Sequence, residues 1–351
     1  MPRARTYAAL VLLPILLCAC QRETLVEHGN RHQIFHRGNG TEPQDLDPHI
    51  VTGVPEHHII TSLLEGLVVP DPKDLHPLPG MAERWDISPD QTLYTFHLRK
   101  NARWSNGELF TAHDFVRSFK RMLTPSLASE YAYMLFVMKN AEAYNEGKLT
   151  NFEEVGAKAL DDFTLQITLN SPTSYFLNLI QHYSWFPVHI PSIEKHGKVY
   201  ERGNRWTRPK NFVGNGPFLL KEWKVNHIII VEKNPTYWDA ETVKLNKIYF
   251  HPIESVDTDD RAFRAGQLHK SYEVPATKIE VYKRTQPEWL HIDPFLGTYF
   301  YAVNVNKKPF TDKRVRHALA MSIDREAIVK NVTTPPRTSR PRVEPRSLIM
   351  K

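Results

Sequence analysis

Residues 81–122 constrain the fold of this 351-residue chain most, because a strand, a turn and a helix follow one another there. Tyr94, Phe96 and Leu98 alternate with Leu93, Thr95 and His97. A period of two over residues 91–98 predicts a strand with one buried face. Ser105-Asn106-Gly107 then predicts a turn, since these residue types favour tight turns.

A capped helix is expected after the turn. Phe115, Phe119 and Met122 recur at helical spacing and predict an apolar inner face. Thr111 precedes them and Asp114 stands three residues after Thr111, so we expect a partial capping box at the helix start. Strand, turn and helix in this order are typical of an α/β scaffold.

The residue identities along this stretch resemble a known family. The matching positions are Ala82-Glu83, Trp85, Tyr94, Phe96, Leu98-Arg99, Ala102, Trp104-Ser105, Gly107, Thr111-Ala112 and Asp114-Phe115-Val116. Their order resembles that of the family 5 extracellular solute-binding proteins, the large peptide-binding receptors of ABC importers. The resemblance extends from about Ile34 to Asn331, and periplasmic oligopeptide-binding proteins look like the nearest relatives.

The resemblance implies an α/β, periplasmic-binding-protein-like (type II) fold with several lobes and mixed sheets. Lobe I is expected at residues 22–64 and 190–295, and lobe II at residues 65–189. Residues 296–331 are expected to begin lobe III, which would be incomplete because relatives continue well beyond this point. Residues 332–351 hold four prolines and five basic residues without apolar period, so we expect a disordered basic tail, produced by a truncation or frameshift.

The N-terminus has the features of a targeting segment. Arg3 and Arg5 precede an apolar run over residues 7–17 that is too short to span a bilayer. Leu17-Cys18-Ala19-Cys20 resembles a bacterial lipobox. We therefore expect a lipoprotein signal peptide at residues 1–19 and lipidation of Cys20, anchoring the protein to the inner or outer membrane. The alternative is an ordinary secretory signal.

Cysteine content and charge exclude several classes of protein. Cys18 and Cys20 are the only cysteines, so the mature body is expected to hold no disulfide and no thiolate metal site. The formal net charge of +6 comes from the two ends of the chain, and the body between them is balanced. We therefore expect no nucleic-acid partner.

The resemblance places a ligand-contacting loop at Thr52, Gly53, Val54 and Pro55. In peptide-binding relatives this loop gives main-chain hydrogen bonds to the peptide, and an added strand explains sequence-tolerant affinity. Gly53 and Pro55 predict an irregular or extended loop, followed by a short apolar helix at residues 59–67. The alternative is an ordinary surface loop.

Three further side chains are ligand-contact candidates by the same resemblance. Tyr131 falls where relatives place a tyrosine against the ligand; otherwise it is a core or rim aromatic. Tyr272 and Glu273 lie in a segment that contacts ligand in relatives, and the carboxylate of Glu273 could meet a peptide amine. A solvated acidic side chain is the alternative for Glu273. His269 stands where the family usually has Asp, which weakens the carry-over at this turn.

No motif for catalysis, metal or cofactor is found. GxxxxGK[ST], HExxH, GxSxG and CxxC are absent. Asp161-Asp162 and Asp259-Asp260 could be offered as catalytic carboxylates, but we expect both pairs in solvated turns. We expect no enzyme activity, no cofactor and no metal site.

The expected function is that of the substrate-binding component of an oligopeptide ABC transporter. A periplasmic, monomeric receptor would capture short peptides and deliver them to the permease subunits. The alternatives are another solute, such as a nickel chelate, haem or a sugar, and a periplasmic hydrolase. With lobe III incomplete, we expect weak or absent peptide binding by this chain.

Overall fold

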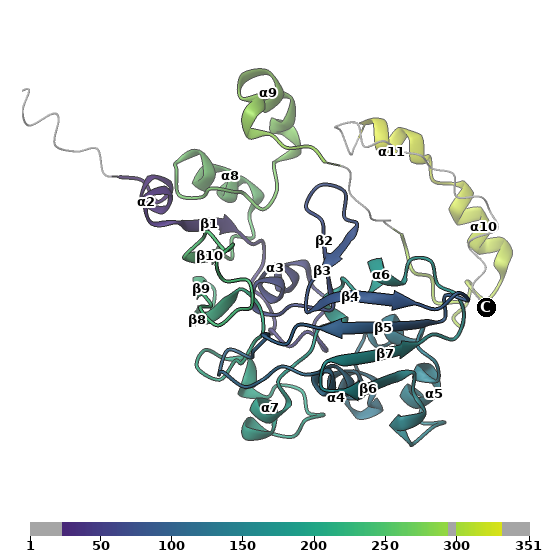
Figure 1. Cartoon of the computed structure of the whole chain (residues 1–351). Helices are drawn as coiled ribbons and strands as arrows, with labels where there is room; N and C mark the ends of the chain where they lie inside the picture. The colour runs from purple at the N-terminus through teal and green to yellow at the C-terminus, as the bar shows by residue number, and fades with distance from the viewer. Residues whose placement is uncertain (1–22, 294–299, 332–351) are drawn as a thin grey trace, which may run out of the picture. The chain divides into compact units, whose positions relative to one another are not determined.

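The computed structural model describes residues 23–293 and 300–331 (Figure 1). The chain divides into two compact units, Met1–Glu273 and Val274–Lys351. The first unit contains all of predicted lobe II and most of predicted lobe I, and the boundaries between the lobes remain predictions. Cys20 lies outside the described residues.

The first unit contains a mixed sheet in the order β1-β10-β9-β8. Its strands are β1 (Ile34–Gly38), β10 (Lys247–His251), β9 (Ile228–Lys233) and β8 (Phe218–Lys224). β1 runs parallel to β10, with Ile34 opposite Lys247, and the other neighbours are antiparallel. The first strand of the unit therefore pairs with its last.

A second, antiparallel sheet contains the strand predicted from the alternating pattern. Its order is β4 (Ala82–Ile87), β5 (Leu93–Leu98), β7 (Thr164–Thr168) and β6 (Ala157–Asp161). Tyr94, Phe96 and Leu98 of β5 are buried, whereas the residues between them are half-buried. This confirms the predicted one-sided burial. β2 (Val68–Pro70) and β3 (Pro77–Pro79) form a separate hairpin.

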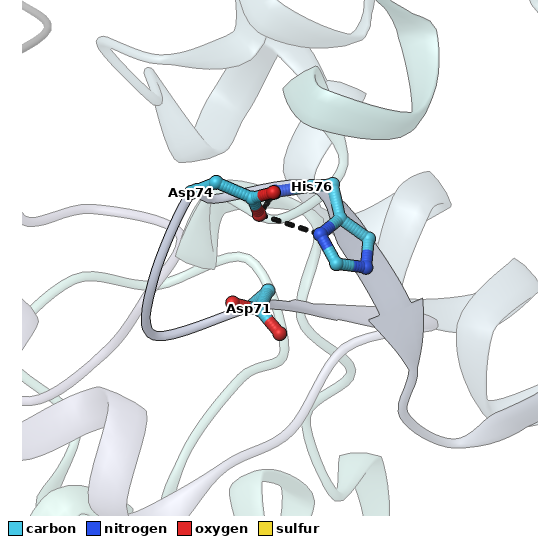
Figure 2. A group of neighbouring side chains, drawn as sticks. All are labelled: Asp71, Asp74 and His76. Carbon is cyan, nitrogen blue, oxygen red and sulfur yellow. Dashed lines mark hydrogen bonds and ion pairs between the residues drawn. The ribbon is translucent and has the colours of Figure 1, made fainter.

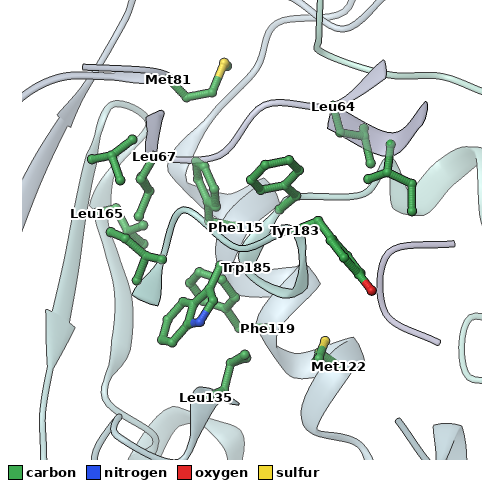
Figure 3. Packing of buried hydrophobic residues seen from close by; sticks show 14 of the residues in the cluster. Leu64, Leu67, Met81, Phe115, Phe119, Met122, Leu135, Leu165, Tyr183 and Trp185 are labelled. Carbon is green, nitrogen blue, oxygen red and sulfur yellow. The ribbon is translucent and has the colours of Figure 1, made fainter. Parts of the chain in front are cut away.

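Helix α4 (Ala112–Leu123) packs on this second sheet. The capping box is confirmed, because the Thr111 amide and hydroxyl donate to Asp114 Oδ2 at 2.8 and 3.1 Å and the Asp114 amide donates to the Thr111 carbonyl at 3.1 Å. Phe115, Phe119 and Met122 are fully buried (Figure 3), and the Phe119 ring lies 5.4 Å from that of Trp185. Burying such a side chain contributes about 2 kcal/mol.

The remaining helices are short. In the first unit they are α2 (Leu25–His32), α3 (Val54–Leu63), α5 (Ala141–Asn145), α6 (Phe176–Leu179), α7 (Ile190–His196) and α8 (Val256–Arg264). The second unit contains α9 (Ile279–Thr285), α10 (Lys313–Met321), which Asp312 caps, and α11 (Arg325–Asn331). Across residues 23–293 and 300–331, no helix has the length and hydropathy needed to cross a bilayer.

Two expectations from the sequence are wrong. Helix α3 begins at Val54 rather than at residue 59, because Pro55 occupies the first turn, where a missing amide hydrogen costs nothing. Val54 and Pro55 are thus helical, and only Thr52 and Gly53 remain extended or irregular. Asp259 and Asp260 are not in a solvated turn; they lie in α8 and are buried. Asp161 and Asp162 are exposed, as expected.

A buried ion pair joins α4 to the segment before α3. Arg121 Nη1 and Nη2 donate to the two carboxylate oxygens of Asp47 at 2.9 and 2.5 Å, and Arg121 Nε donates to the Val199 carbonyl at 2.7 Å. His49 Nδ1 lies 3.0 Å from Arg121 Nη1, and its Nε2 donates to the Phe186 carbonyl at 3.1 Å. Burial, with the Arg121 charge, lowers the pKa of His49 to about 4, so the imidazole is neutral at pH 7.

Glu65 fixes the segment that follows α3. Its carboxylate is buried and accepts from the Tyr237 hydroxyl at 2.7 Å and from Trp238 Nε1 at 2.6 Å. The Asn215 side chain bonds to both the amide and the carbonyl of Glu65, at 3.0 and 2.9 Å. Burial raises the pKa of Glu65 to about 7, although the two donors oppose that rise.

Candidate ligand-binding site

The predicted ligand-contacting loop lies at the N-terminus of α3. Gly53 is the capping residue with an extended conformation, φ −88° and ψ 154°, and no side chain caps this end of the helix. Thr52 and Val54 are exposed, and Val54 retains 54% of its surface. The Thr52 and Val54 side chains are therefore accessible to a ligand, whereas the carbonyls of Thr52 and Gly53 already accept from the Tyr131 hydroxyl and the His57 amide.

Tyr131 is joined directly to this segment. Its hydroxyl donates to the Thr52 carbonyl at 3.2 Å, and the hydroxyl of Tyr183 donates to the Val51 carbonyl at 3.1 Å. Burial raises the pKa of both tyrosines, so both hydroxyls keep their protons at neutral pH. The two phenols hold the main chain just before α3 in its extended conformation.

Two imidazoles complete this side of the site. The His182 ring lies 5.1 Å from that of Tyr131 and 4.2 Å from that of Tyr183. The His57 ring lies 5.6 Å from that of Tyr183. Burial lowers the pKa of His182 to about 4 and also lowers that of His57. We refer to residues 52–55 together with His57, Tyr131, His182 and Tyr183 as the α3 wall. At pH 7 the rings of this wall are uncharged.

Tyr272 approaches the site beside the next residue of α3. Its ring lies 6.0 Å from that of His58, edge to face. The ring also packs on Gly40, where an added Cβ would come within 3.1 Å of it. Burial, with the Arg37 charge, lowers the pKa of His58 to about 3, and its Nδ1 lies 3.3 Å from Asn39 Oδ1. Glu273 follows Tyr272 with an exposed side chain.

The structure thus groups most of the candidates around the first two turns of α3. Thr52 contacts Tyr131 directly, and Tyr272 reaches the helix through His58. His57, His182 and Tyr183 also belong to this wall, and the sequence did not indicate them as parts of it. Val54, His57 and His58 are spaced i, i+3 and i+4. A helix predicted to start at Val54 would therefore have placed the side chains of His57 and His58 on the same face as Val54.

Neither of two surface hollows contains a candidate residue. One is lined by residues of β4, β5, β6 and β7 and of the turn between β6 and β7, among them Arg84, His97 and Asp161. The other lies at the start of α4, beside Thr111 and Arg117. The contacts at α3 instead form a largely buried cluster of rings, beside which Thr52 and Val54 are exposed.

One group of side chains in the described part of the chain has the spacing of metal ligands. Asp71, Asp74 and His76 lie in the turn between β2 and β3, with ligand atoms within 4.8 Å of one another (Figure 2). His76 Nδ1 lies 2.5 Å from Asp74 Oδ1, which raises the pKa of His76. This turn shares no residue with the α3 wall.

Comparison with known proteins shows clear relatives. The family model of the bacterial extracellular solute-binding proteins, family 5 Middle, matches residues 76–342. The periplasmic oligopeptide-binding protein OppA of Escherichia coli is 43% identical over 303 residues, 86% of this chain and 54% of that protein. The dipeptide-binding protein DppE of Bacillus subtilis is 38% identical over 302 residues, 86% of this chain and 53% of that protein.

Solved structures agree with these sequences. Haemophilus influenzae OppA, in complex with RPPGFSPFR, has a TM-score of 0.79 at 37% identity, covering 85% of this chain and 57% of that one. The Escherichia coli murein tripeptide-binding protein MppA has a TM-score of 0.78 at 36% identity, with the same coverage.

This chain spans about half the length of the curated relatives it matches. Its mixed α/β architecture is that of the type II periplasmic binding proteins. The chain belongs to family 5 of the bacterial extracellular solute-binding proteins.

Proposed function

We propose that this protein is the substrate-binding component of an oligopeptide ABC transporter. It would capture short peptides in the periplasm and deliver them to the permease subunits. The observation that carries the proposal is the likeness to OppA of Haemophilus influenzae, which was solved with a bound peptide. The α3 wall, where the Tyr131 hydroxyl bonds to the Thr52 carbonyl just before the extended residue Gly53, supports it.

The proposed binding mode uses the backbone first. An extended peptide alongside Thr52, Gly53 and Val54 would form main-chain hydrogen bonds, which give affinity without reading side chains. Pro55 lies in the first turn of α3, so the extended segment ends at Gly53. Tyr131 and Tyr272 would supply ring surfaces to the ligand, and Glu273 an acceptor for a peptide amine.

Binding without turnover completes the proposal. The relatives are solute-binding proteins, so we infer that this protein is not an enzyme and needs no cofactor. Lobe I at residues 22–64 and 190–295, lobe II at 65–189 and lobe III from 296 would close around the ligand. We also propose a monomer that is attached to the membrane through lipidated Cys20.

Ligand class is tested by direct binding. Tri- and tetrapeptide mixtures, a nickel chelate, haem and a sugar mixture are titrated into the purified chain by calorimetry, with ligand-observed NMR to reach millimolar affinity. We expect binding of the peptides alone, with no hydrolysis of the recovered peptide. Binding of a chelate, haem or sugar without any peptide binding would refute the proposal, as would turnover of the peptide.

A matched pair of variants links the binding to the α3 wall. Tyr131→Phe removes the hydroxyl that bonds to the Thr52 carbonyl, whereas Tyr133→Phe changes a neighbouring tyrosine that is 56% exposed. Weaker peptide binding in Tyr131→Phe but not in Tyr133→Phe would place the ligand at this wall.

A further inference from the structure

Asp259 is a buried carboxylate whose hydrogen-bond partner is main chain. It lies in α8 and is fully buried. Its Oδ2 accepts from the Tyr272 amide at 2.5 Å, and its Oδ1 has no hydrogen-bond partner in the part of the chain that the structure describes. Burial raises the pKa of Asp259, and the amides of Tyr272 and Glu273 oppose that rise.

β1 approaches the same point closely. Gly38 has no side chain there, and an added Cβ would collide with Asp259 Oδ1 and lie 2.9 Å from the Tyr272 nitrogen. The Gly38 amide donates to the Lys270 carbonyl at 2.9 Å, so β1 holds the chain up to Lys270. The chain leaves the sheet at Ser271, and Asp259 then bonds to the amide of the next residue, Tyr272.

The position of Tyr272 depends on this junction. Two residues beyond Gly38, Gly40 provides the surface on which the Tyr272 ring packs, next to His58 of α3. A buried carboxylate is costly unless it is hydrogen-bonded, and a bond from an amide to a charged acceptor is among the stronger kinds. The Asp259 carboxylate thus bonds mainly to the backbone of Tyr272 and Glu273, which are two of the candidate ligand contacts.

We propose that Asp259 is a positioning residue of the ligand site. Its carboxylate fixes the main chain at Tyr272 and Glu273, and so holds the Tyr272 ring on Gly40 and His58 beside α3. This inference rests on the proposed function, and it assigns to α8, which provides no candidate contact, the role of setting the shape of the binding wall.

The test compares Asp259→Ala, which removes the acceptor, with Asp259→Asn, which keeps one oxygen of the same shape. Amide hydrogen exchange of the full chain is read at Tyr272 and Glu273 and across β9, β10 and α4. We expect Asp259→Ala to exchange about tenfold faster at Tyr272 and Glu273 only, and Asp259→Asn to stay within about threefold of the wild type. Asp257→Asn, an exposed carboxylate in the same helical turn, is the control.

A double-mutant cycle reads the coupling to the ligand. Asp259→Ala and Tyr272→Ala are each expected to weaken tripeptide binding about tenfold, and the double variant no further than either single one. A purely structural role predicts losses that multiply, together with faster exchange throughout the unit. Either of these results would overturn the proposal, and so would unchanged exchange at Tyr272 and Glu273 in Asp259→Ala.

Two further arms keep the outcome decisive. If Asp259→Ala does not fold, Asp259→Leu fills the same volume without an acceptor, and the same local exchange pattern is expected. If the wild type binds no peptide, the proposed function fails, but the exchange comparison still decides whether Asp259 positions Tyr272.

Discussion

Removing the guanidinium of Arg121 should destabilise the first unit severely. Arg121→Met keeps much of the side-chain volume but removes both bonds to Asp47, the bond to the Val199 carbonyl and the contact with His49 Nδ1. The Asp47 carboxylate, 2% exposed, would be left charged and without its cation. Leaving one partner of a buried pair uncompensated costs about 3–5 kcal/mol.

The double variant Asp47→Asn/Arg121→Met measures how much of each single loss comes from the interaction between the two side chains. It removes both charges, so we expect a loss of about 2–4 kcal/mol, mainly from the unpaired Val199 carbonyl and His49 Nδ1. This is no larger than the loss from one single substitution, and therefore far below the sum of the two. The coupling between the two sites should be about 3 kcal/mol or more.

Urea unfolding at pH 7 measures these free energies through tryptophan fluorescence, because Trp185 and Trp104 are buried in the same core. A loss of about 4 kcal/mol corresponds to a fall in Tm of about 10 °C for a unit of this size. Burial alone would raise the pKa of Asp47, but the Arg121 charge brings it below its usual value. The stabilisation is therefore complete above about pH 4 and is lost at lower pH. A single-variant loss below about 1 kcal/mol, or additive losses, would refute this account.

Three other perturbations test separate features of the structure. Glu65→Gln should remove a pH dependence: because the folded pKa of about 7 lies above the unfolded value, wild-type stability should fall by up to about 3 kcal/mol from pH 4.5 to pH 7. Gln can still accept from Trp238 and donate to the Tyr237 oxygen, so its urea midpoint should vary less with pH over this range; an equal slope would contradict the assignment. Tyr131→Phe should weaken peptide binding about three- to tenfold in calorimetric or NMR titrations, because the Thr52 carbonyl loses a donor worth about 1 kcal/mol; a loss of equal size in Tyr133→Phe would contradict it. Thr111→Ala should cost about 1 kcal/mol in urea unfolding, since it removes half of the capping box of α4, and an unchanged midpoint would show that this cap is not needed.

Local patterns predicted the elements whose structure is set by their own sequence. The alternation of Tyr94, Phe96 and Leu98 fixes which face of β5 is buried, and Thr111 with Asp114 fixes where α4 begins. Both depend on neighbours within a few residues, so both were readable without a structure.

Other features depend on contacts between distant residues. Gly53 and Pro55 are residue types that are common both in loops and at the start of a helix. The sequence therefore did not distinguish the two, and the start of α3 was predicted five residues too late. The burial of Asp259 follows from its approach to Gly38 and Tyr272, which no local period encodes. The wall formed by Tyr131, His182 and Tyr183 likewise assembles from separate segments, and the resemblance to the family indicated only Tyr131.

The pairing of β1 with β10 has a consequence for the order in which this chain folds. The sheet that contains β5 is built from residues 82–168, so it can form as soon as that stretch has reached the compartment where the chain folds. β1 ends at Gly38, yet its partner begins at Lys247. About 200 residues of chain must therefore follow β1 before its partner is present. During that interval its edge is unpaired, and unpaired strand edges promote aggregation. Among the strands of the described residues, the first in sequence is therefore one of the last to be paired.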